Sequence, residues 1–273
     1  MPDTLPEQQR AGRIAAAFQR LRASDRRAFI PYVTAGYPRP ADTLGVLALL
    51  AEEGADVIEL GIPFSDPLAD GPTIQAATWS ALRQGVDIPG VLRWTAAFSA
   101  GSDVPIVLFS YLNPVLRYGP ERFLADAEDA GAAGLLLTDL PVGEDGELEE
   151  ILTSANLDLV RLVAPTTRRE RMARIVEAAR GFIYYISRTG VTGERAALRE
   201  ELANEVAGLR EVTDLPIAVG FGISNFEQAR LVAGVADGVV VGSALVRSLG
   251  EEGLDGARRL ARTLREGVDA ATP

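Results

Sequence analysis

Three reactive residue types are missing from this sequence. It contains no cysteine, no histidine and no lysine, so all 27 basic residues are arginines. Without cysteine there is no disulfide framework and no thiolate chemistry, and the redox compartment is not encoded. Histidine general bases, Ser-His triads, Schiff-base lysines and the usual zinc sites are excluded as well. Because arginine titrates too high to shuttle protons at neutral pH, acid–base catalysis must fall to Asp, Glu or Tyr.

Long apolar runs are also missing. No run approaches the roughly 18 apolar residues that a membrane span needs, and the first ten residues do not resemble a signal peptide. The formal net charge of −11 argues against nucleic acid or an anionic membrane as a partner. We therefore expect a cytoplasmic globular protein, and 273 residues suit one large or two small domains.

Short apolar runs and helical patterns alternate along the chain. Residues 5–22 have the spacing of an amphipathic helix, with Ile14, Phe18 and Leu21 on one face. The apolar runs that predict strands are Phe29–Thr34, Val57–Gly61, Ile106–Tyr111, Leu135–Asp139, Leu159–Ala164, Phe182–Ser187, Pro216–Gly220 and Gly238–Val241. The long gap between the second and third runs predicts two helices.

Local signals place several helix ends. Helical patterns cover Thr43–Glu53 and Pro120–Ala130, each followed by glycine. Thr167 with Glu170, and Ser224 with Glu227, have the spacing of a capping box and predict two further helix starts.

Eight strand–helix units in about 250 residues predict a closed (β/α)8 TIM barrel with an extra N-terminal helix. An open doubly wound sheet would normally carry a glycine-rich fingerprint after the first strand, and Thr34-Ala35-Gly36 is too sparse for one. No linker or change in composition divides the chain. We therefore expect residues 1–273 to form a single barrel domain, with residues 1–22 as an N-terminal extension and helix.

The working face of such a barrel lies at the carboxyl ends of its strands, where polar residues and glycines collect in this sequence. The positions at these ends are Tyr32, Thr34, Glu59, 109–113, Asp139, 184–188, 220–224, Gly242 and Ser243. Loop starts are often polar in any protein, so this pattern leaves a purely structural interpretation open for part of the set.

Glu59 and Asp70 are the candidate acid–base pair. Strand alternation places Glu59 on the same face as Val57 and Gly61, which points into the barrel. Burial raises the pKa of a carboxyl, whereas a nearby, wetter carboxyl such as Asp70 stays ionised. The alternative is that Glu59 is a buried acid satisfied by hydrogen bonds and that Asp70 caps a turn.

Two glycine segments predict a phosphate site. Gly220–Ser224 follows the seventh run and Gly242–Leu245 the eighth, which is where barrels of this architecture hold phosphate with backbone N–H groups. The hydroxyl of Ser243 would add a donor, although the glycines could also serve tight turns alone. Ser187–Gly193 suits either a lid that closes over a ligand or an ordinary connection.

These motifs resemble one known family, the tryptophan synthase α subunits. The segment ELGIPFSDPLADGPTIQ, residues 59–75, closely resembles the family signature, and SRTGVTG, GFGIS and GSALV follow in the family's order. PYVTAGYP, residues 31–38, also fits. The resemblance covers nearly the whole chain after the first dozen residues.

The resemblance implies a lyase that splits indole-3-glycerol phosphate into indole and D-glyceraldehyde 3-phosphate in tryptophan biosynthesis. By motif match, Glu59 would be the catalytic acid/base and Asp70 would hold the indole N–H. The implied substrate-binding residues are Tyr32, Phe109, Asp139, Tyr184, Thr192 and Phe221, and the implied phosphate-binding residues are Gly193, Gly222, Gly242 and Ser243. The family commonly has Phe at the position of Tyr32 and an aliphatic residue at that of Phe109, which could alter packing in the pocket.

The resemblance also implies a partner. Family members form an α2β2 heterotetramer with a β subunit that carries pyridoxal phosphate and receives indole through a tunnel, while the α chain carries no cofactor. The implied partner contacts, on loops around the working face, are Asp66, Pro67, Asn113, Pro114 and Pro141.

Besides the complexed lyase subunit, three other interpretations of the sequence are open. A free-standing lyase that releases indole is barely separable by sequence from the complexed subunit. Another phosphate-binding barrel, such as an indole-glycerol phosphate synthase or a phosphosugar isomerase, is disfavoured because the lysine or cysteine of such sites is absent. A silent subunit that only regulates a β partner is disfavoured because both Glu59 and Asp70 are present.

Overall fold

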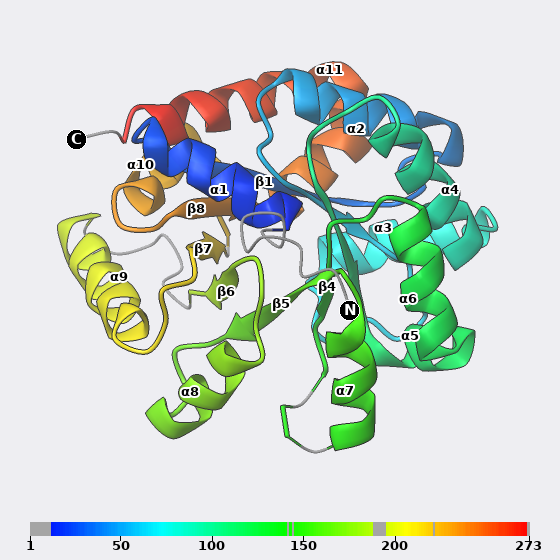
Figure 1. The fold of residues 1–273 in the computed structure, drawn as a ribbon. Helices are drawn as coiled ribbons and strands as arrows, with labels where there is room; N and C mark the ends of the chain where they lie inside the picture. Colours follow the sequence, from blue (N-terminus) through cyan, green and yellow to red (C-terminus); the bar gives the residue numbers. More distant parts are fainter. Residues whose placement is uncertain (1–11, 141, 144, 188–194, 221, 272–273) are drawn as a thin grey trace.

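A computed structural model describes residues 12–140, 142–143, 145–187, 195–220 and 222–271. Its eight parallel strands close into a barrel in chain order, with β8 paired to β1 (Figure 1). The strands are β1 Ala28–Thr34, β2 Ile58–Gly61, β3 Ile106–Ser110, β4 Gly134–Leu137, β5 Asp158–Val163, β6 Ile183–Ile186, β7 Ile217–Gly220 and β8 Gly238–Val241. The predicted (β/α)8 fold is confirmed.

Helices surround the barrel and connect its strands. They are α1 Arg13–Ala23, α2 Thr43–Glu52, α3 Pro72–Arg83, α4 Ile88–Ser99, α5 Leu112–Tyr118, α6 Pro120–Asp129, α7 Gly146–Ser154, α8 Arg169–Glu177, α9 Arg195–Arg210, α10 Phe226–Ala233 and α11 Ser243–Asp269, with a short 3-10 helix η2 at Pro40–Asp42. The two helices expected between the second and third strands are α3 and α4.

Strand register assigns each side chain to the inside or the outside of the barrel. Ile58 and Leu60 of β2 belong to the large apolar layer between strands and helices, whereas Val57 belongs to a separate cluster inside the barrel. Glu59 alternates with Ile58 and Leu60 and is paired in register with Tyr32 of β1. The alternation therefore points its carboxyl inward, as predicted.

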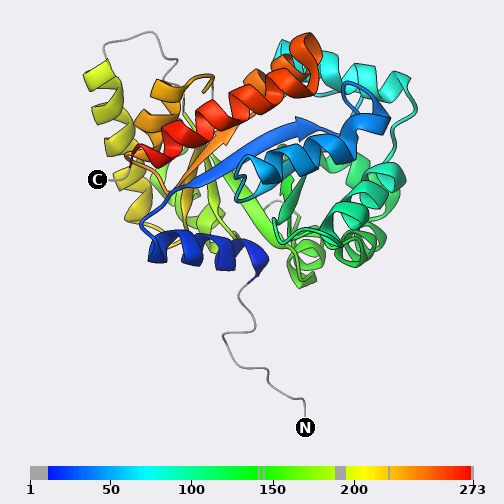
Figure 2. The same cartoon turned by 90° about the horizontal axis from the view of Figure 1, so that it is seen from above.

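Helix α1 closes the N-terminal end of the barrel. Ile14, Phe18 and Leu21 are buried in the inner cluster, and the rings of Phe18 and Phe182 lie 5.8 Å apart. In Figure 1 α1 crosses in front of the strands, and the turned view of Figure 2 places it at one end of the barrel. The predicted apolar face of this helix is confirmed, and residues 1–11 lie outside the described part of the chain. The carboxyl ends of the strands lie at the other end.

Both predicted capping boxes are wrong. Helix α8 begins after Arg168 without a side-chain cap, and the Thr167 hydroxyl instead accepts a hydrogen bond from the N–H of Ala164 at 3.1 Å. At α10 the cap is Asn225, whose side chain accepts from the N–H of Gln228 at 3.0 Å. The second motif was therefore placed one residue too early.

The described residues include no helix that is both long and apolar enough to cross a membrane.

Candidate active site

A cavity of about 400 Å³ opens at the carboxyl ends of the strands. The described residues that line it are Tyr32, Glu59, Ala69, Asp70, Gly71, Ile74, Phe109, Thr138, Leu162, Tyr184, Ile186, Gly222, Ile223, Ser224, Val240, Gly242, Ser243, Ala244 and Arg247. The cavity therefore combines the candidate acid pair, an aromatic wall and the glycine segments after the last two strands.

Glu59 is held protonated by its surroundings. Its side chain is 1% exposed, and its Oε1 atom has no hydrogen-bond partner among the described residues. Burial away from water disfavours the carboxylate and raises the pKa of Glu59 to about 8. A carboxyl with an unused oxygen in a cavity is poised to deliver a proton to a bound molecule.

Asp70 lies in the loop that leads into α3, and it is half-buried. Burial raises its pKa to about 6, an effect opposed by a hydrogen bond from the Tyr111 hydroxyl. That hydroxyl also accepts a hydrogen bond from the N–H of Ala69 at 2.9 Å, so Tyr111 fixes the loop beside the carboxylate. Gln75 donates to the backbone oxygen of Asp70 at 2.9 Å.

The two carboxyls consequently differ in charge over a defined range of pH. Between about pH 6 and about pH 8 Glu59 keeps its proton while Asp70 has lost its own. One group can then donate a proton while the other stabilises a positive charge in the same cavity.

Aromatic side chains form one wall of the cavity. The rings of Tyr32 and Phe109 meet edge to face, with centroids 5.1 Å apart. The Tyr32 hydroxyl lies 3.4 Å from that of Thr34. Burial raises the pKa of the Tyr184 phenol, so that side chain stays neutral and able to donate a hydrogen bond. The wall suits a flat apolar ring.

The part of the cavity around Gly222 and the start of α11 has the features of an anion site. Helix α11 begins at Ser243, and its cap residue, Gly242, offers no side-chain hydrogen bond. The first N–H groups of a helix have no partner within the helix and carry partial positive charge. Gly222 has φ +72°, a conformation that glycine adopts without strain and other residues rarely adopt. A phosphate placed here would meet backbone donors.

One candidate residue does not line the described cavity. Asp139 is exposed and does not line the described cavity; its carboxylate accepts a hydrogen bond from the N–H of Leu112 at 2.6 Å, at the start of α5. Its neighbour Thr138 lines the cavity instead. Strand β4 ends at Leu137, so the chain has already turned outward at Asp139.

Other candidates lie outside the described residues. They are Pro141, Thr192, Gly193 and Phe221, together with most of the predicted lid.

The expected partner contacts are only partly on loops. Asp66 is exposed and Pro67 buried in the loop between β2 and α3, whereas Asn113 and Pro114 form part of the first turn of α5. All four nevertheless follow the carboxyl ends of strands, on the side of the barrel where the cavity opens.

Two residues of the site were not singled out by the sequence analysis. Tyr111 was placed at the working face but was given no role. Its position directly after β3, at the carboxyl end of a strand, indicated that it could contribute to the site. Arg247 was not identified. It lies four residues after Ser243 on a helix that starts at the phosphate loop, and this spacing places the two side chains on the same face of the helix.

Sequence comparisons find a matching family and similar proteins. A family model described as tryptophan synthase alpha chain matches residues 18–271. A protein of that name from Synechococcus elongatus is 48% identical over 257 residues, which cover 94% of this chain and 97% of the relative. One from Geobacter sulfurreducens is 47% identical and covers 86% of this chain and 89% of the relative.

Solved structures show the same likeness. A chain in an aminoacrylate-bound crystal structure of tryptophan synthase from M. tuberculosis superimposes with a TM-score of 0.85 at 40% identity, over 94% of this chain and all of that one. Tryptophan synthase subunit alpha from Legionella pneumophila superimposes with a TM-score of 0.87 at 36% identity, over 94% of this chain and 98% of that one.

Proposed function

The chain belongs to the tryptophan synthase alpha chain family, and on that premise we propose which of its residues perform the family's reaction. It is a lyase subunit of tryptophan biosynthesis that cleaves indole-3-glycerol phosphate to indole and D-glyceraldehyde 3-phosphate. It works with a β subunit in a heterotetramer, and indole passes to that subunit. A free-standing lyase that releases indole is not favoured.

Cleavage of the bond between the indole ring and the glycerol chain needs an acceptor for the electron pair. The chain contains no lysine to form an imine, but the indole ring can accept the electrons itself. Protonation of C3 gives an indoleninium cation, and the C–C bond then breaks as the electron pair returns to the ring. The hydroxyl on the adjacent glycerol carbon loses its proton and becomes the aldehyde of glyceraldehyde 3-phosphate.

We assign delivery of the C3 proton to Glu59 and stabilisation of the cation to Asp70. The observation that carries this assignment is that Glu59, 1% exposed and with Oε1 unpartnered among the described residues, lines the same cavity as Asp70. Asp70, ionised at neutral pH, would accept a hydrogen bond from the indole N–H, whose positive charge grows in the transition state. Once Glu59 is deprotonated, it can receive the proton of the glycerol hydroxyl.

The remaining assignments follow the shape of the cavity. Tyr32 and Phe109 would pack on the indole ring, and Tyr184 would face the glycerol portion. Gly222, Gly242 and Ser243 would hold the phosphate. Thr192, Gly193 and Phe221 keep the roles that the resemblance implies, as do the five partner contacts.

We also propose that the whole chain is one domain that acts in the cytoplasm. The closed barrel, which spans β1 to β8, supports the first point. The relationship to a biosynthetic enzyme family supports the second.

A single assay tests the function. Purified protein is incubated with indole-3-glycerol phosphate, with and without a β subunit, and indole and glyceraldehyde 3-phosphate are both measured. Equal amounts of the two products are expected without β subunit, and tryptophan should replace indole when β subunit and serine are added. Absence of cleavage under both conditions would refute the proposal.

The pH profile of kcat/KM should be bell-shaped. The competent form has Glu59 protonated and Asp70 ionised, so the rate should rise near pH 6 and fall near pH 8. Because the substrate phosphate also titrates at about pH 6, the alkaline limb is the diagnostic one. A kcat/KM that stays constant from about pH 7 to about pH 9.5 would show that a protonated Glu59 is not required.

Substitution of Gly242 should weaken phosphate binding. A Cβ at this position would already be in contact with the Tyr32 ring at 3.5 Å, so the two methyl groups that Gly242→Val adds beyond it would crowd the start of α11 where the amides meet the anion. Loss of one charge-assisted hydrogen bond costs about 1.5–3 kcal/mol, so we expect at least a tenfold higher Kd for glycerol 3-phosphate by calorimetry. Gly208→Val, at an exposed position of α9 with no atom within 4 Å of the added Cβ, is the control. Equal affinities in the two variants would contradict the site.

A further inference from the structure

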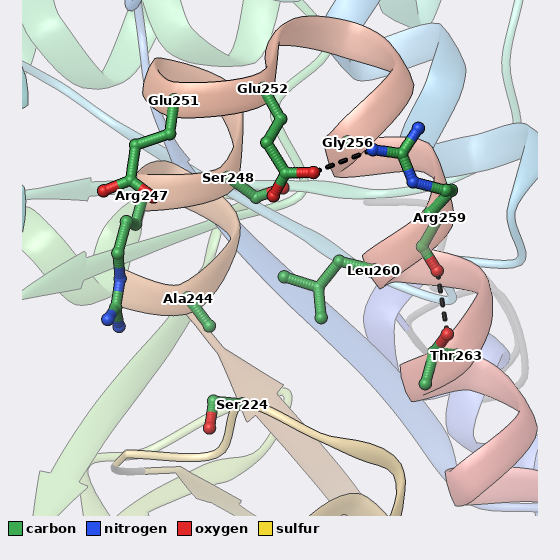
Figure 3. Close-up of a pocket in the computed structure, with 10 residues that line it drawn as sticks. All are labelled: Ser224, Ala244, Arg247, Ser248, Glu251, Glu252, Gly256, Arg259, Leu260 and Thr263. Carbon is green, nitrogen blue, oxygen red and sulfur yellow. Dashed lines mark hydrogen bonds and ion pairs between the residues drawn. The ribbon is translucent and has the colours of Figure 1, made fainter.

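A second cavity of about 410 Å³ lies against α11 between Ala244 and Thr263 and shares Ser224, Ala244 and Arg247 with the active-site cavity. The two cavities therefore meet at the phosphate end of the active site. Figure 3 shows the residues of this outer cavity, with Arg247, Glu251, Glu252 and Arg259 as its charged members.

Arg247 is the one cationic residue among the described residues that line the active-site cavity. The two carboxyl residues there are Glu59, which is protonated at neutral pH, and Asp70, which is ionised, and the whole protein has a formal net charge of −11. A dianionic phosphate ester that approaches this cavity would meet a protein of its own sign, and Arg247 is the local exception.

The position of Arg247 is unfavourable without an anion. It is the fifth residue of α11, and helical side chains lean toward the N-terminus, so its charge lies near the positive end of the helix. The first turn of α11 contains no acidic residue to compensate. A cation placed at the N-terminal end of a helix is a local electrostatic conflict, and such conflicts are expected at functional sites.

The Arg247 guanidinium also makes no ion pair with Glu251, the nearest acidic residue at a suitable helical spacing. Glu251 lies four residues further along the helix, a spacing at which an ion pair would form readily. No ion pair or hydrogen bond joins Arg247 to a described residue, whereas Arg259 in the same cavity contacts Glu252 at 2.7 Å. Figure 3 shows the Arg247 side chain running away from Glu251 and toward Ala244.

We propose that Arg247 binds the phosphate dianion of the substrate and selects for a doubly charged substrate. With the phosphate bound at Gly222, Gly242 and Ser243, the guanidinium supplies charge-assisted hydrogen bonds in addition to those of the backbone. The anion relieves the conflict at the start of α11 because it is attracted by the helix and by the side chain at once. This inference rests on the proposed phosphate site.

The test compares Arg247→Gln with Arg259→Gln, a control that lies beyond the kink at Gly253 of α11 and outside the active-site cavity. In Arg247→Gln we expect KM for indole-3-glycerol phosphate to rise about tenfold at low ionic strength with kcat within about twofold, because ground-state and transition-state binding are lost equally. Affinity for uncharged indole-3-propanol should not change. Arg247→Lys should recover part of the loss, and Arg259→Gln should behave as the parent.

Ionic strength gives a second measurement. The advantage of the parent over Arg247→Gln in kcat/KM should shrink as salt rises from about 10 mM to about 300 mM, because salt screens the attraction between the guanidinium and the phosphate. A KM within twofold of the parent, or an equal loss of affinity for indole-3-propanol, would overturn the role of Arg247. If the parent itself cleaves nothing, the proposed function fails; if the parent cleaves normally, only this inference is at stake.

Discussion

The Glu59→Gln variant should still bind the substrate but should no longer cleave it at an appreciable rate. The amide preserves the size of the side chain but has no acidic proton to give, and general acid–base catalysis contributes about 10²–10⁴-fold to a rate. We therefore expect kcat to fall by at least about 10²-fold, with the Kd for indole-3-glycerol phosphate within about threefold of the parent. Single-turnover indole release and calorimetry measure the two quantities. Glu150→Gln, an exposed change on α7, is the control.

The same variant should show a changed dependence of stability on pH. The pKa of Glu59 is raised from 4.5 to about 8 in the folded state, so the folded protein holds a proton that the unfolded chain has released. The stability due to that proton is complete below about pH 4.5 and falls toward about pH 8, by at most about 1.4 kcal/mol per pH unit.

Glu59→Gln removes this dependence, so the variant should be more stable than the parent above about pH 8, by on the order of a few kcal/mol. Urea midpoints measured across the pH range provide the comparison. Identical slopes for variant and parent would place Glu59 in contact with water or with a charge partner, contrary to its burial. A stable but inactive variant would also exclude misfolding as the cause of lost activity.

Asp70→Asn should be the second most damaging change. The substitution keeps an oxygen that can accept from the indole N–H, but it removes the negative charge that faces the developing cation. Loss of one preorganised electrostatic group costs about 10²–10³-fold in kcat, and a fall of that size is expected in steady-state assays. The alkaline limb of the pH profile should persist, because it belongs to Glu59. Asp103→Asn, at the closed end of the barrel, is the control.

The Tyr111→Phe variant helps to distinguish the effect of the Asp70 charge from the effect of the position of the Asp70 carboxylate. It removes the hydroxyl that donates to Asp70 and that accepts from the Ala69 N–H, but the carboxylate remains. A smaller loss than in Asp70→Asn is consistent with the charge as the main contribution. Wild-type kcat in Asp70→Asn itself would remove Asp70 from the chemistry.

The barrel was predictable because its signals are periodic. Alternation along residues 57–61 was enough to point Glu59 inward, and helical patterns lay between successive apolar runs. Cap positions were less predictable, since both Ser224 and Asn225 are good N-caps and the loop geometry selected Asn225. Asp139 lies outside the described cavity because the strand ends two residues earlier than its apolar pattern suggested.

The electrostatics of the site could be predicted only in part. Burial of Glu59 follows from strand alternation, but its unpartnered oxygen requires knowledge of every neighbour in three dimensions. In the sequence, nothing distinguishes Arg247 from the other 26 arginines. Its position beside the phosphate site becomes visible only in the structure, where α11 begins at the cavity. The hydrogen bond between Tyr111 and Asp70 joins two loops that are distant in sequence.

Helix α1 covers the end of the barrel opposite the cavity. Ile14, Phe18 and Leu21 pack there into the inner apolar cluster, whereas the described cavity opens at the carboxyl ends of the strands. A β subunit that binds over those carboxyl ends would therefore lie where indole is released. The N-terminal helix, remote from the candidate acid pair, closes the end of the barrel that such a partner would leave uncovered.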